Sequence, residues 1–265
     1  MYVFSPAYPT PQHEEAARHA TEFFAQQPGV NAVLLACSCA RGKATPDSCL
    51  DLAVLLDASE AAAQRSKIEA AWSQVYADDP VYAALLGVGK YSHVDISFSS
   101  GQFVPDNYRH GWTLGPDFFE LDIGNTFAYT IPLWQREDRF DQLQARWLPY
   151  YSDKLREERL AMVRKYCLNN LHHIPPYVDR GLYFQAFRRL YDAFGEFLQA
   201  LFIARRTYPI AYDKWVREQI VDILQLPALY PQLVAMLEVH HLESDELKDK
   251  AAALEHLLET YAPAE

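Results

Sequence analysis

The chain has 265 residues, of which 50% are hydrophobic and 14% aromatic, enough to bury the core of one large or two modest globular domains. The net charge is −11, and neither half of the chain has an excess of lysine and arginine, which excludes a typical nucleic-acid-binding surface and favours a small or cationic partner. No apolar run approaches the ~20 residues of a membrane span, no signal peptide is evident, and four cysteines are too few for a disulfide framework. We therefore expect a cytoplasmic protein with reduced thiols that contacts neither membrane nor nucleic acid.

The first part of the chain alternates short β-rich runs with amphipathic helical stretches. The segment 93–99 places Val94, Ile96 and Phe98 on one face and polar residues on the other, which is typical of a half-buried strand. Four or so strands flanked by helices indicate one mixed sheet. The predicted elements are helices over 14–27 and 59–77 and strands over 30–36, 50–57, 93–99 and 118–134.

After residue 150 the strands stop and long helical periods begin, so the sequence predicts an α+β fold with a sheet domain over 1–150 and an α-helical bundle over 151–265. The clearest helix covers 182–206, where apolar residues recur every three or four positions. We interpret this stripe as bundle core in preference to a ligand pocket. Its predicted members are Tyr183, Phe184, Phe187, Leu190, Tyr191, Phe194, Phe197, Leu198 and Leu201.

A polar loop between two apolar strands carries the most informative pattern. After the first strand come Ser38 and Arg41, and the next strand carries Asp51. Positions 49 and 51 share a face of that strand, and Asp95 on a later strand can reach the same place. Each residue has an ordinary explanation alone, because Ser38 can cap a helix and Arg41 can pair with a surface acid. Together they predict acidic side chains beside a phosphate-binding turn, as two-metal phosphoryl transfer requires.

At these residues the sequence resembles the nucleotidyltransferase superfamily that contains DNA polymerase beta and the aminoglycoside nucleotidyltransferases. The family pattern runs Gly-Ser, a short gap, Arg-Gly, about ten residues, Asp-x-Asp on a strand, and a third Asp on a later strand. Ser38, Arg41, Asp51 and Asp95 match this pattern, whereas Cys37 and Cys49 stand at the positions of the glycine and of the first metal-binding aspartate. The helical second half resembles the bundle of the small-molecule-modifying members.

The resemblance implies transfer of a nucleoside monophosphate from a nucleoside triphosphate, expected to be ATP, to a hydroxyl of a small and perhaps cationic acceptor. It assigns Mg²⁺ and catalysis to Asp51 and Asp95, and the triphosphate to Ser38, Arg41 and Lys214 in a cleft between the domains. The alternative is an impaired descendant that binds a nucleotide or a protein partner. The sequence sets neither the acceptor nor the oligomeric state.

Cys49 decides between these alternatives, because Mg²⁺ takes hard oxygen ligands and a thiol is a poor substitute for a carboxylate. Asp47 in the preceding loop can replace it in part, although its "TPDS" context is that of a solvated turn.

The cysteines also allow a different class of site. Cys37, Cys39 and Cys49, with Cys167 or a histidine, are candidate zinc ligands, but they lack the paired spacing of known zinc ribbons. Buried, reduced thiols are the interpretation we prefer.

Overall fold

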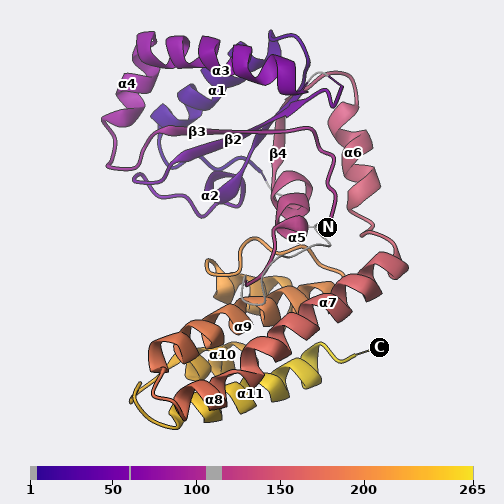
Figure 1. Cartoon of the computed structure of the whole chain (residues 1–265). Helices are drawn as coiled ribbons and strands as arrows, with labels where there is room; N and C mark the ends of the chain where they lie inside the picture. Colours follow the sequence, from indigo (N-terminus) through magenta and orange to yellow (C-terminus); the bar gives the residue numbers. More distant parts are fainter. Residues whose placement is uncertain (1–4, 60, 106–114, 265) are drawn as a thin grey trace. The chain divides into compact units, whose positions relative to one another are not determined.

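The computed structural model describes residues 5–59, 61–105 and 115–264 (Figure 1), and the chain forms two compact units. The sheet unit comprises Met1–Phe103 and Asp122–Pro149, and the helical unit comprises Val104–Leu121 and Tyr150–Glu265. The fold is α+β, as predicted. That the chain consists of domains divided near residue 150 stays a prediction. Within the described residues, no helix is both long and apolar enough to cross a membrane.

The sheet unit is built on a four-stranded mixed sheet in the order β3-β2-β1-β4. Strand β1 pairs antiparallel with β2 and β4, and β2 pairs parallel with β3. The strands are β1 (Val30–Leu35), β2 (Leu50–Leu56), β3 (Val94–Ser99) and β4 (Ile131–Gln135). The helices are α1 (Pro11–Ala25), α2 (Cys37–Ala40), α3 (Ala61–Asp78), α4 (Pro80–Leu86) and α6 (Arg139–Trp147). Glu60, in the predicted helix 59–77, lies outside the described residues.

Helices α1, α3 and α4 cover one face of this sheet (Figure 1). Leu50, Leu52 and Val54 of β2 pack against them, and Ile96 and Phe98 of β3 lie on the same side. Because side chains alternate along a strand, the residues between these positions point to the opposite face. The polar side of β3 therefore lies on the face away from this core, as the sequence predicts.

The predicted strand over 118–134 is wrong for residues 118–130. Most of these residues form α5 (Phe119–Ile123) and a π-helical turn (Gly124–Ala128), and only the end of the segment becomes β4. The carboxylate of Asp117 accepts a hydrogen bond of 3.1 Å from the backbone N–H of Phe119, which satisfies a free donor at the helix start. The apolar residues Phe119, Ile123 and Phe127 are buried at helical spacing. The aromatic content that suggested a strand thus fits a helix equally well.

The helical unit contains α7 (Asp153–His172), α8 (Ile174–Val178), α9 (Tyr183–Ala204), a π-helix (Glu218–Ile223), α10 (Tyr230–Leu237) and α11 (Glu246–Tyr261). Helix α9 contacts α7, α8 and α11. The predicted core stripe of α9 is confirmed for its second half, where Phe197 and Leu201 are fully buried. In the first half it is confirmed for Leu190, which is fully buried, and wrong for Phe184 and Tyr191, which are 78% and 44% exposed.

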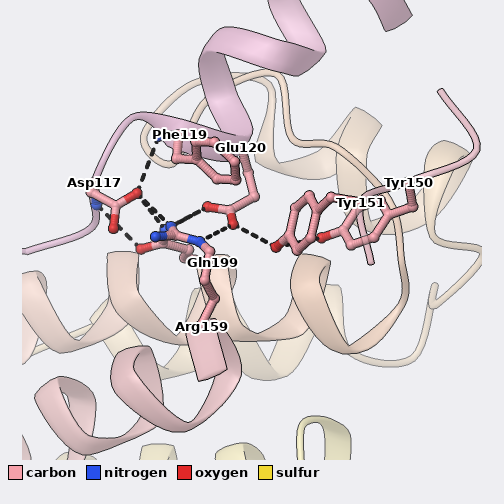
Figure 2. A network of polar contacts seen from close by, with 7 residues as sticks. All are labelled: Asp117, Phe119, Glu120, Tyr150, Tyr151, Arg159 and Gln199. Carbon is pink, nitrogen blue, oxygen red and sulfur yellow. Dashed lines mark hydrogen bonds and ion pairs between the residues drawn. The ribbon is translucent and has the colours of Figure 1, made fainter. Parts of the chain in front are cut away.

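Within the helical unit, a buried polar network connects residues 117–120 to α7 and α9 (Figure 2). Arg159 of α7 is 1% exposed and donates to Glu120 at 2.5 and 2.7 Å and to Asp117 at 2.7 Å. Gln199 of α9 donates to the same two carboxylates at 2.9 and 2.8 Å. The hydroxyl of Tyr151 donates to Glu120 at 2.7 Å, and burial raises the pKa of this tyrosine well above its ordinary value. Two buried carboxylates are thus held by one guanidinium and by neutral donors.

Candidate functional site

The turn after β1 supplies the first part of the site. The chain leaves β1 at Ala36 and enters α2, whose first residue, Cys37, has a φ of +52°. A positive φ of this size is the left-handed region, which glycine adopts without strain and other residues adopt at a cost. Ser38 lies inside α2 and is half-buried, and no side chain caps this helix. Ser38 as an N-cap, the ordinary explanation, is therefore not seen.

Asp51 and Asp95 are brought together by the pairing of β2 with β3. The two residues are register partners on adjacent parallel strands, on the face opposite the α1, α3 and α4 core. Both line a cavity of about 410 Å³ in the sheet unit, a size typical of ligand pockets. The geometric expectation that these carboxylates meet on one face is confirmed.

Cys49 completes this group. One ligand atom each of Cys49, Asp51 and Asp95 lies within 4.8 Å of the other two, and the Cys49 Sγ is 3.2 Å from Asp51 Oδ2. Burial, with Asp51 and Asp95 nearby, raises the pKa of the Cys49 thiol to about 12. Burial also raises the pKa of Asp51, against the hydrogen bond from the thiol, and the charge of Asp95 adds to the rise. The raised pKa keeps the thiol in its neutral form, and its S–H donates to Asp51 Oδ2.

His93 is a site residue that the sequence analysis missed. It precedes β3, and its Nε2 lies 3.2 Å from Asp95 Oδ2. Residues two apart at the start of a strand share a face, so the spacing His-x-Asp is the signal that could have revealed it. Three more residues that were not predicted line the same cavity, Asp122 from α5 and Asn125 and Thr126 from the π-helical turn after it. That segment was predicted to be a strand.

The donor set fits one Mg²⁺ and not two. Asp51 and Asp95 offer the oxygen ligands that Mg²⁺ prefers, and such ions are commonly held by one or two carboxylates together with substrate phosphates. The position of the first aspartate holds the sulfur of Cys49, which is a soft and uncharged ligand. An ion that depended on this position would lack a hard ligand there.

The other predicted site residues are placed differently. Asp47 Oδ1 accepts a 3.3 Å hydrogen bond from the backbone N–H of Tyr91, and Asp47 is outside the three-residue group. Arg41 ends α2 and is only 7% exposed, and among the described residues neither it nor Ser38 lines the cavity. Lys214 belongs to the helical unit, where its side chain is exposed. Its role toward a triphosphate stays a prediction.

A larger cavity, of about 870 Å³, lies along α7 in the helical unit and is lined by residues that include Leu160, Arg164, Lys165 and Leu168. Size alone would favour it as a binding site. Among the described residues, however, the one group of His, Cys, Asp or Glu close enough to share an ion is in the sheet unit. We therefore take the smaller cavity as the candidate site, because it combines a concave surface with convergent acidic groups.

The backbone at Cys37 leads to a first prediction. We expect Cys37→Gly to raise the free energy of unfolding by about 0.5–1 kcal/mol. The change relieves left-handed backbone strain of ~1–2 kcal/mol, and the larger conformational entropy that glycine loses on folding offsets part of this gain. Urea unfolding followed by circular dichroism measures the change. Cys37→Ala is the control, since it removes the same thiol and keeps the Cβ atom. If both variants shift the unfolding midpoint equally, the backbone conformation is not the cause.

Comparison of the sequence with protein-family models and with curated proteins finds no match.

Proposed function

We propose that the sheet unit is a nucleotidyltransferase-like domain that binds a nucleoside triphosphate, ATP being the first candidate, and transfers its nucleoside monophosphate to a hydroxyl of a small acceptor. The observation that carries the proposal is the pairing of Asp51 with Asp95 in register on parallel strands, at one cavity. The left-handed turn at Cys37 supports it independently. That residue stands where the resembling family has glycine, and its backbone adopts a conformation that glycine favours.

The chemistry assigns one role to each group. Asp51 and Asp95 would hold Mg²⁺, which when bound neutralises charge on the triphosphate. Asp95 is the more exposed of the two, with a side chain 58% exposed, and His93 beside it orients its carboxylate. It is therefore the residue placed to accept the proton of the acceptor hydroxyl. The hydroxyl oxygen forms a bond to the α-phosphorus, and pyrophosphate leaves.

A second candidate function has its own support. The Cys49 thiol donates to Asp51, so one of the two carboxylates is already engaged by a neighbour that brings no charge. A descendant that binds the nucleotide and transfers it slowly or not at all would have this arrangement. Both candidates predict nucleotide binding, and they differ in the release of pyrophosphate.

Calorimetric titration with ATP, with and without Mg²⁺, tests the proposal. We expect binding that depends on Mg²⁺ and is lost in Asp51→Asn and in Asp95→Asn. Asp57→Asn is the matched control, because Asp57 directly follows β2 at its other end and its carboxylate accepts hydrogen bonds from Ser59 in a local turn. Binding that is unaffected by all three changes would refute the assignment. Pyrophosphate release with small cationic hydroxyl compounds then separates the two candidates.

A further inference from the structure

The donors around Asp51 include more than the oxygen ligands that Mg²⁺ takes. The group offers a sulfur from Cys49, carboxylate oxygens from Asp51 and Asp95, and beside them the imidazole Nε2 of His93. Sulfur, nitrogen and oxygen together are the ligands of Zn²⁺ in proteins, and four such ligands are its usual number. Mg²⁺ takes oxygen ligands, so the sulfur of Cys49 and the imidazole nitrogen of His93 would not bind it.

The spacing of these donors suits a small tetrahedral ion. With bonds of 2.0–2.3 Å to zinc, neighbouring ligand atoms of a tetrahedron lie roughly 3.3–3.8 Å apart. The Cys49 Sγ to Asp51 Oδ2 distance and the His93 Nε2 to Asp95 Oδ2 distance are both 3.2 Å. The sulfur and the two carboxylate ligand atoms all lie within 4.8 Å of one another. His93 lies outside this group and contacts Asp95, so its imidazole has to turn toward the ion to become the fourth ligand. The cavity lined by Asp51 and Asp95 provides the path of entry.

We propose that Cys49, Asp51, Asp95 and His93 form a binding site for Zn²⁺, selected over Mg²⁺ by the thiol of Cys49. On binding, the thiol releases its proton to solvent and the sulfur becomes a thiolate ligand of the ion. The inference rests on the proposed function in that both assign a metal to Asp51 and Asp95. Binding of Zn²⁺, however, requires no nucleotide.

Titration of the chelator-treated protein with Co²⁺ tests this, because Co²⁺ bound to a thiolate gives a charge-transfer absorption band that Co²⁺ on oxygen ligands lacks. In the wild type we expect the band to develop with one Co²⁺ per chain and to disappear when one Zn²⁺ is added. Cys49→Ser should lose the band, and its Zn²⁺ affinity should fall at least ~10-fold. Cys37→Ser, which changes the neighbouring thiol, should keep the band.

Two further variants guard against effects on folding. Asp95→Asn alters an exposed side chain on β3 and should also weaken Zn²⁺ at least ~10-fold. Asp47→Asn is its control, since it neutralises a nearby loop carboxylate outside the group and should bind Zn²⁺ like the wild type. A wild type without the band, or a band that persists in Cys49→Ser, overturns the proposal. Neither result affects Mg²⁺-dependent ATP binding, so a failure here and a failure of the proposed function are distinguishable.

Discussion

Replacing Arg159 by methionine is expected to lower the free energy of unfolding by about 3–5 kcal/mol, the usual cost of removing one partner from a buried ion pair. The change keeps much of the side-chain volume but leaves Asp117 and Glu120 without their guanidinium (Figure 2). Glu120 is fully buried, so water cannot replace the lost partner. Urea unfolding followed by circular dichroism measures the loss.

Arg18→Met is the matched control for this experiment. Arg18 also contacts two carboxylates, those of Glu15 and Glu22, but its side chain is 51% exposed, so its removal should leave stability nearly unchanged. A rescue separates charge from packing. Adding Glu120→Gln to Arg159→Met removes one uncompensated charge and should recover part of the stability. Equal losses in the two arginine variants, or no recovery in the double variant, would contradict the role given to the network.

Cys49→Asp has the largest expected effect on the candidate site. It restores a hard ligand beside Asp51 and Asp95, and a charged ligand contributes on the order of 1–3 kcal/mol. We therefore expect Mg²⁺-dependent ATP binding to tighten by about 10- to 100-fold. Without a metal the added carboxylate repels its two neighbours, so the same variant should be less stable than the wild type and should regain stability when Mg²⁺ is added.

Cys49→Ser isolates charge from size in this comparison. It removes the thiol, adds no charge, and should bind Mg²⁺ and ATP like the wild type. Calorimetric titration of the three proteins gives the affinities, and thermal unfolding with and without Mg²⁺ gives the stabilities. If the aspartate variant gains neither affinity nor Mg²⁺-dependent stability, position 49 is not part of a magnesium site.

The sheet was predictable because its signals are local. Alternation along 93–99 and apolar runs over 30–36 and 50–57 identify three strands, and the side-chain period of two places Asp51 and Asp95 away from the core. The prediction of a strand over residues 118–130 failed for an equally local reason. Aromatic and β-branched residues are typical of strands. The hydrogen bond from the backbone N–H of Phe119 to Asp117 starts the helix, but nothing in the sequence distinguishes Asp117 from the other acidic residues.

The sequence predicted the two carboxylates of the site, Asp51 and Asp95, but not the groups that contact them. The contact between Cys49 and Asp51 follows from the spacing of two residues at the start of a strand. That the thiol keeps its proton depends on burial, which the sequence does not reveal. The left-handed backbone of Cys37 has no signal in a cysteine. The pairing of Arg159 with residues about forty positions earlier lies beyond any local pattern, since charged side chains are usually exposed.

The helical unit is made of two separate stretches of chain, with residues 122–149 of the sheet unit between them. This matters during synthesis, when the N-terminal part of a chain leaves the ribosome first. Asp117 and Glu120 emerge before β4, yet their partners Arg159 and Gln199 emerge well after it. Until those partners have been synthesised, the two acids lack the guanidinium and amide donors that hold them in the folded protein. A truncated protein that begins at residue 150 would carry Arg159 with neither carboxylate, so a shortened gene for expressing the helices needs to retain the segment around residues 115–121.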